Sequence, residues 1–117
     1  MSRTGKSIPC LKLAGTGIFF LMSFSLLGMG IGDASIEKVR EGNRRYQEKK
    51  YEDAINKYKE ALKINPSSAI AAFNMGVAKY KQGYYASSIN DFNAVIAKKD
   101  SALEAKAHYN LGNAFFK

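Results

Sequence analysis

The sequence has few of the residues from which most catalytic and metal sites are built. Its 117 residues include one cysteine, Cys10, and one histidine, His108. These counts exclude a histidine-based metal cluster and a disulfide within the chain. There is also no glycine-rich phosphate loop and no set of nucleophile, base and orienting residue. The sequence therefore indicates no enzyme class, and we expect no cofactor.

Charged residues are missing from a long stretch near the N-terminus. Residues 13–32 contain none, and Arg3, Lys6 and Lys12 precede them. A basic start, an apolar stretch and then small residues are the order of a secretory signal. The densest apolar run, residues 18–27, is short for a membrane-spanning helix, which needs about 20 apolar residues. We therefore predict that residues 1–34 are a signal peptide.

An uncleaved anchor stays open as an alternative, with membrane association through residues 13–32. Cleavage would fall after Ala34 or after Gly30, where small residues gather. Both alternatives take the rest of the chain out of the cytoplasm. Cys10 precedes the apolar run, whereas the lipid-modified cysteine of a bacterial lipoprotein would follow it.

Acidic residues are outnumbered in the rest of the chain. Residues 35–117 contain fifteen Lys or Arg and nine Asp or Glu, a net charge of +6. This balance suits acidic partners, and it raises binding to nucleic acid or to an anionic surface as an alternative function. The basic residues are scattered in pairs, at 44–45, 49–50 and 98–99, which is typical of a solvated face. With the predicted export, this favours a protein partner and no nucleic acid.

The sequence after the predicted signal repeats with a fixed period. A shift of thirty-four residues, and then one of thirty-six with two extra residues near 98–103, superposes small and aromatic residues. The aligned sets are Gly42, Gly76 and Gly112; Tyr46, Tyr80 and Phe116; Tyr51 and Tyr85; and Tyr58 and Phe92. A fixed period of this length indicates stacked copies of one supersecondary unit.

Each unit has the spacing of two amphipathic helices. Ala54, Tyr58 and Ala61 recur at i, i+4 and i+7, and Pro66 with the two serines after it ends one helix and begins the next. We expect helices over 35–48, 53–64, 69–82, 86–98 and 103–117. The predicted fold is all-α, an α-solenoid of antiparallel helix pairs over residues 35–117. Its repeats are 35–68, 69–104 and a partial 105–117, and the aligned glycines allow close helix crossings.

These residues resemble the tetratricopeptide-repeat (TPR) family. The residues that carry the resemblance are Gly42, Tyr51, Ala54, Ile55, Tyr58, Ala61, Leu62 and Pro66, then AAFNMGVAKYKQGYYASSINDF over 71–92 and AKAHYNLGNAFFK over 105–117. The departures are mild: Asp100 stands where Pro66 stood, Val95 where a small residue is usual, and Arg45 and Lys79 where an aromatic residue is frequent. The resemblance implies a non-catalytic scaffold for protein–protein interaction.

The arrangement of the whole chain is similar to a narrower group. A signal or anchor, two repeats, a long loop and then AKAHYNLGNAFFK resemble the TPR component of bacterial aerotolerance (Bat) operons. That resemblance implies a periplasmic or inner-membrane protein whose TPR domain lies outside the cytoplasm. It also implies a von Willebrand A-type envelope protein as partner.

The first helix of each pair lines the concave face of such a solenoid, so its exposed residues are candidates for binding a peptide. The candidates are Val39, Asn43, Tyr46, Phe73, Asn74, Val77, Tyr80, Lys81, Lys106, Tyr109 and Asn113. Aromatic residues would bury ligand side chains, amides would pair with its backbone, and lysines would attract acidic groups. Some TPR proteins grip a terminal carboxylate with a clamp of Lys, Asn, Asn, Lys and Arg. The matching positions here are Val39, Asn43, Asn74, Lys106 and Asn110, which lack two of the positive charges.

The last predicted helix, 103–117, corresponds to the first helix of a third pair. We expect its apolar face, including Leu111, Ala114 and Phe115, to lack the cover that its counterparts have. Three readings stay open: a fragment of a longer protein, a helix that is itself a cap, or self-association through this helix.

Overall fold

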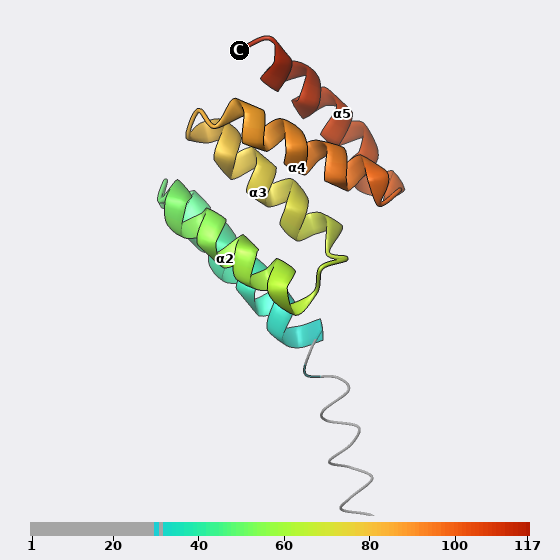
Figure 1. Cartoon of the computed structure of the whole chain (residues 1–117). Helices are drawn as coiled ribbons and strands as arrows, with labels where there is room; N and C mark the ends of the chain where they lie inside the picture. Colours follow the sequence, from blue (N-terminus) through green and yellow to red (C-terminus); the bar gives the residue numbers. More distant parts are fainter. Residues whose placement is uncertain (1–29, 31) are drawn as a thin grey trace, which may run out of the picture. The chain divides into compact units, whose positions relative to one another are not determined.

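The computed structural model describes residue 30 and residues 32–117, and Gly32–Lys117 forms one compact unit. The signal or anchor predicted over 1–34 lies almost wholly outside the described residues. Within those that are described, every regular element is a helix (Figure 1). None of these helices is long and apolar enough to cross a membrane.

From residue 47 onward the helix limits lie within two residues of the predicted ones, whereas helical structure begins earlier than predicted, since residue 30 is already helical. The first runs through residues 32–47 and is followed by α2 (Tyr51–Ile64), α3 (Ala69–Lys81), α4 (Tyr85–Ala97) and α5 (Ser101–Phe115). Residues 32–34 are already helical, three residues before the predicted start of the domain at residue 35. The compact unit therefore includes part of the segment assigned to the signal.

Side-chain caps decide where α3 and α5 begin. Ser68 accepts a hydrogen bond from the backbone N–H of Ala71, as the serines after Pro66 predicted. Asp100 accepts from the N–H groups of Ala102 and Leu103, so α5 begins two residues before the predicted position. An aspartate in place of the proline of the preceding repeat thus starts the helix by capping it.

Three helices are followed by a left-handed residue, and the third of these residues is Lys99 after α4, with φ 55°. Lys49 has φ 59° and Gly83 has φ 83°, and the two positions coincide under the shift of thirty-four. The N–H of the next residue donates five residues back at these two positions, Lys50 to the carbonyl of Arg45 and Tyr84 to that of Lys79. These ends turn the first helix back along α2 and α3 back along α4.

The helices stack in chain order, with α2 against α3, α3 against α4 and α4 against α5 (Figure 1). Two groups of buried side chains lie between them. The first contains Val39, Ala54, Ile55, Tyr58, Ala61, Ala71, Met75 and Ala78, and the second contains Ala72, Phe92, Val95 and Ala107. Since residues of successive repeats share each group, the repeats bury one another's apolar faces.

Two glycines admit the largest buried side chains. A Cβ atom at Gly42 would lie 2.5 Å from the ring of Tyr58, and one at Gly76 would lie 2.8 Å from the ring of Phe92. Both rings are almost fully buried. The predicted role of these glycines, close approach of the second helix, is confirmed. At Gly112 an added Cβ would meet no atom within 4 Å.

Aromatic pairs join the two helices of each complete pair. Tyr46 lies edge-on to Tyr51 with 5.2 Å between ring centroids, and Tyr80 lies in the same way on Tyr85, also at 5.2 Å. Phe73 and Phe92 are 5.9 Å apart. These are distances at which aromatic rings attract one another beyond simple burial.

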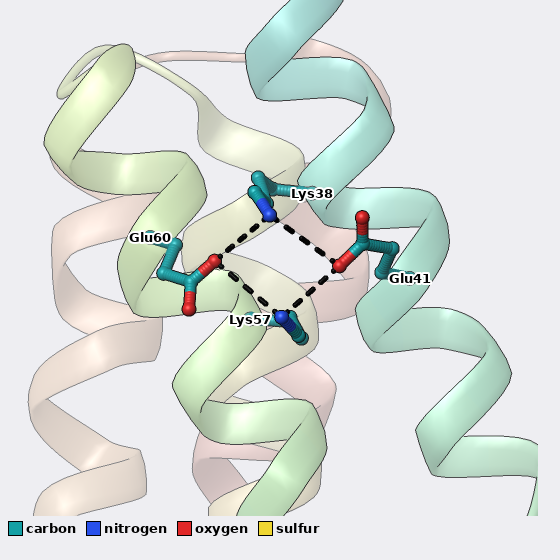
Figure 2. A network of polar contacts seen from close by, with 4 residues as sticks. All are labelled: Lys38, Glu41, Lys57 and Glu60. Atoms are coloured by element: carbon teal, nitrogen blue, oxygen red, sulfur yellow. Dashed lines mark ion pairs between the residues drawn. The ribbon is translucent and has the colours of Figure 1, made fainter.

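Ion pairs connect the first helix to α2 in a closed ring of alternating charge, which Figure 2 shows. Lys38 Nζ lies 3.1 Å from Glu60 Oε2, and Lys57 Nζ lies 3.1 Å from Glu41 Oε2. Contacts of 3.5 and 3.6 Å within each helix close the ring. The hydrogen bonds from Lys57 to Glu41 and from Lys38 to Glu60 lower the pKa of both carboxyl groups.

The last helix corrects one expectation. Ala114 is buried, with 3% of its surface exposed, and Leu111 packs against the second buried group. Of the three residues expected to lack cover, only Phe115 is exposed, at 66%. The reason is register: Leu111 and Ala114 align with Met75 and Ala78, which face the preceding repeat, and that repeat is present.

Candidate protein-binding surface

The candidate binding residues lie on the first helix, α3 and α5. A hydrogen bond from Asn74 Nδ2 to Asn43 Oδ1, 2.9 Å long, joins the first helix to α3, and α3 also contacts α5. Residues that are far apart in the sequence are thereby brought to adjacent helices. We call the candidate side chains on the first helix, α3 and α5 together the first-helix surface.

The amide of Asn43 is held by two neighbours. Its Oδ1 accepts from Tyr58 Oη at 2.7 Å as well as from Asn74. Burial raises the pKa of Tyr58 to about 12, so this phenol stays protonated and remains a donor at neutral pH. Among the described residues, none bonds to the side-chain N–H groups of Asn43 or to the side-chain oxygen, Oδ1, of Asn74. Donors and an acceptor of fixed orientation are thus available at the surface.

Several candidate side chains are wholly or partly buried by packing within the fold. Val39 is buried in the first group, with 8% exposed, so it offers no contact to a ligand. Tyr46, Phe73, Val77 and Tyr80 are half-buried, and each packs against a buried group or a second-helix ring. Their remaining surface is apolar and lies on the first helix and α3, the two helices that the Asn43–Asn74 bond joins.

The other candidates are more open. Asn43, Lys81 and Lys106 are exposed, Asn74 and Asn113 are half-buried, and Tyr109 is 72% exposed. Lys81 ends α3 and Lys106 lies in the first half of α5, so positive charge flanks the surface at two separate points. These lysines can attract an acidic ligand without any rearrangement of the core.

The five clamp positions meet different surroundings. Asn43 and Asn74 are in contact, Lys106 is exposed, Asn110 is half-buried and Val39 is buried. The two asparagines are already bonded to each other, and Val39 supplies no charge. Only Lys106 brings a cation, so attraction for a terminal carboxylate is weaker than a five-residue clamp would give.

The hydrogen-bonded group at Tyr58 was not predicted from the sequence, although a signal for it exists. The shift of thirty-four aligns Asn43 with Val77 and Tyr58 with Phe92. The first repeat therefore has the polar pair Asn43 and Tyr58 where the second repeat has the apolar pair Val77 and Phe92. A joint change of this kind marks two positions that touch.

A second unpredicted feature is an ion pair between α3 and α4. Lys79 Nζ lies 2.9 Å from Asp91 Oδ2, and both side chains are only 13% exposed. The alignment is poor for a hydrogen bond, and Oδ2 has no other partner. Burial therefore raises the pKa of Asp91, and Lys79 offsets only part of that effect. This pair lies between helices and is a packing feature rather than part of the first-helix surface.

No grouping of three His, Cys, Asp or Glu side chains suited to a metal ion occurs in the part of the chain that the structure describes. The chemistry available on the first-helix surface is that of recognition: amide hydrogen bonding, aromatic contact and positive charge.

Comparison with known proteins agrees with the repeat. A family described as TPR repeat matches residues 42–83, and one described as tetratricopeptide repeat matches residues 73–117. The fold is similar to the N-terminal domain of stress-induced protein-1 (STI-1) from C. elegans, with a TM-score of 0.68 and 26% sequence identity over 73% of this chain and 71% of that one. No curated protein sequence matches the chain significantly. Residues 42–117 are therefore tetratricopeptide repeats, the family to which this part of the chain belongs.

Proposed function

We propose that the protein is a non-catalytic scaffold that binds a peptide or protein segment on the first-helix surface. The observation that carries this proposal is the exposed contact between Asn43 and Asn74. This contact orients the side-chain N–H groups of Asn43 and the side-chain oxygen of Asn74, which have no partner among the described residues. An extended peptide backbone needs such donors and acceptors, and here they stand beside half-buried aromatic rings.

The charge of the surface supports an acidic ligand. Lys81 at the end of α3 and Lys106 on α5 are exposed, and neither is in an ion pair with any described residue. Their attraction would act over several ångströms and speed the encounter with an acidic segment. Half-buried Phe73 and Tyr80 would then supply the apolar contact that holds it.

The proposal extends to the cell envelope. The basic and apolar N-terminal segment supports export, and the resemblance to the TPR component of aerotolerance operons supports a von Willebrand A-type partner at the inner membrane. A reporter enzyme that is active only outside the cytoplasm, fused to Lys117, tests the location. Activity of this fusion supports export, and inactivity of a well-expressed fusion contradicts it.

The binding surface is tested by pull-down from envelope membranes, with the full chain as bait. Lys81→Glu with Lys106→Glu reverses both charges and should abolish binding of an acidic partner, because like charges repel. The fold should be unaffected, because both lysines are exposed. Lys59→Glu with Lys63→Glu is the matched control, since it makes the same charge change at exposed positions of α2. A partner lost equally from both variants would show that only total charge matters.

The same variants distinguish the alternative of nucleic-acid binding. Binding of single-stranded DNA through phosphates should fall steeply between 50 and 200 mM salt, on the order of a thousandfold for six or more contacts. Strong binding with that salt dependence, lost in both charge variants, would contradict the peptide-binding proposal.

A further inference from the structure

Two isoleucines beside the first-helix surface are exposed and take no part in the core. Ile36 is 50% exposed and Ile70 is 45% exposed, and neither belongs to the two groups of buried side chains. A single exposed isoleucine is common on protein surfaces. These two, however, are aligned by the shift of thirty-four. Successive repeats therefore present an apolar side chain at the same exposed position.

Both isoleucines lie on the side of their helices that carries the candidate binding residues. Ile36 precedes Asn43 by seven residues, and Ile70 precedes Asn74 by four. Residues at these separations lie on one side of a helix. The two isoleucines thus extend the first-helix surface toward the N-terminal ends of the first helix and α3.

The residue at the corresponding position of α5 is a lysine. The shift of thirty-six aligns Ile70 with Lys106, which is exposed and forms no ion pair with any described residue. We call Ile36, Ile70 and Lys106 the isoleucine–lysine row. Along the three helices, this row presents two apolar side chains and then a cation.

The spacing along the isoleucine–lysine row follows from helix packing. The hydrogen bond between Asn43 and Asn74 places the first helix directly beside α3, and α3 contacts α5. Neighbouring members of the row are therefore separated by roughly 10 Å, since the axes of helices in contact lie about 8–10 Å apart. A ligand that contacts the whole row must present its side chains at the same interval.

The amides of the first-helix surface favour one ligand conformation. A polyproline II segment advances about 9 Å in three residues and returns its side chains to the same side, whereas a helix needs about seven residues for that distance. The side-chain N–H groups of Asn43 and the Oδ1 atom of Asn74 have no partner among the described residues. Only an extended backbone has free groups to pair with them, because a helix bonds its own backbone internally.

We infer that the isoleucine–lysine row sets the sequence preference of the bound segment. The segment is extended and has two apolar residues three positions apart and an acidic residue three positions further, in one chain direction or the other. The apolar residues lose contact with water against Ile36 and Ile70, and the acidic residue meets Lys106. The inference rests on the proposed function, to which it adds the two isoleucine contacts and the order of the ligand side chains.

Selection of random twelve-residue peptides displayed on phage, with the full chain immobilised, tests the inference. We expect the wild type to enrich the stated pattern. Ile36→Ser with Ile70→Ser should lose the preference at both apolar positions and should bind a peptide selected by the wild type at least tenfold more weakly. Tyr84→Ser is the control, since Tyr84 is 48% exposed but lies outside the row, and it should select the wild-type pattern. Circular dichroism should show an unchanged helical signal in all variants.

A charge reversal tests the third position separately. Lys106→Glu should replace the acidic residue of the selected peptides with Lys or Arg, and it should leave the two apolar positions unchanged, because opposite charges attract. Lys63→Glu makes the same change at an exposed position of α2, and we expect it to select the same peptides as the wild type.

Failure of the inference can be told apart from failure of the proposed function. If the wild type enriches no peptide, the first-helix surface is not a peptide site and both fail. If the wild type enriches peptides and the isoleucine variant selects the same sequences, the inference is overturned while the proposed function stands. Apolar positions seven residues apart would also overturn it, because the ligand would then be helical.

Discussion

At the scale of single residues, three aligned glycines have three different surroundings. The ring of Tyr58 leaves no space for a Cβ at Gly42, and the ring of Phe92 leaves none at Gly76, whereas Gly112 faces open space. One substitution therefore has opposite effects at positions that the sequence makes equivalent. The repeat defines where a glycine occurs, and the packed neighbour defines whether it is needed.

Alanine at each glycine tests this difference. Gly42→Ala and Gly76→Ala should each lower the free energy of unfolding by about 1–3 kcal/mol, since a buried ring must move. Gly112→Ala should raise it by up to about 1 kcal/mol in dilute solution, because alanine favours the helix and meets no neighbour. Urea unfolding followed by circular dichroism measures all three. A loss of stability in Gly112→Ala as large as in Gly76→Ala would contradict this account.

The buried phenol of Tyr58 gives a pH dependence that can be isolated. Its pKa is about 12 in the folded chain, whereas an unfolded tyrosine ionises near 10. The unfolded chain therefore releases this proton first, and the contribution of Tyr58 is complete below pH 10 and falls as the pH rises toward 12. Over that interval the wild type should lose about 2 kcal/mol more than Tyr58→Phe.

Comparison with Tyr58→Phe isolates the effect of the phenol, because the titration of lysines at high pH affects the stability of both proteins alike. At pH 8, Tyr58→Phe should be less stable by about 1 kcal/mol, since the hydrogen bond to Asn43 is lost. The difference should shrink and reverse at high pH. Parallel stability curves from pH 8 to 12 would show that the phenol is not protected.

At the scale of elements, the ring of Lys38, Glu41, Lys57 and Glu60 joins the first helix to α2 by charge, beside the hydrogen bond from Tyr58 to Asn43 (Figure 2). Its carboxyl groups have lowered pKa values in the folded chain. Their contribution is therefore present above the unfolded pKa of about 4.5 and disappears as the pH falls through the lowered folded value. Because the side chains are solvated, salt should weaken the contribution.

Replacing both acids with amides tests the ring. At pH 7 and low salt, Glu41→Gln with Glu60→Gln should melt at a lower temperature than the wild type. The difference should be small, and it should close at pH 3 and in 1 M salt. Glu37→Gln is the control, because Arg40 of the same helix is the one described residue with which Glu37 forms an ion pair. An equal effect of the control would mean that the ring does not act between helices.

At the scale of the whole molecule, stability and binding depend on different side chains of the same helices. The repeats bury one another's apolar faces between the helices. The first-helix surface would bind a ligand through exposed side chains such as Lys81 and Lys106. Charge reversal at these two lysines should therefore weaken binding and leave the fold intact.

The sequence by itself determined the helices and their order. The helical spacing of Ala54, Tyr58 and Ala61 and the serines after Pro66 act within a few residues, so they can be interpreted without a structure. The repeat then indicated which residues share a role. These are local or periodic properties, and the predicted limits of α2 to α5 were accordingly correct to within two residues.

The first helix of each pair has apolar residues on two sides. Only the tertiary structure decided which of these sides packs on the preceding repeat. Leu111 and Ala114 pack on the preceding repeat, while Tyr109 and Phe116 stay open; periodicity along one helix does not specify that choice. Burial of Val39, the bond between Tyr58 and Asn43, and the charge ring were likewise decided by contacts between helices. Such contacts depend on how helices cross, and the crossing is fixed only when both surfaces are packed.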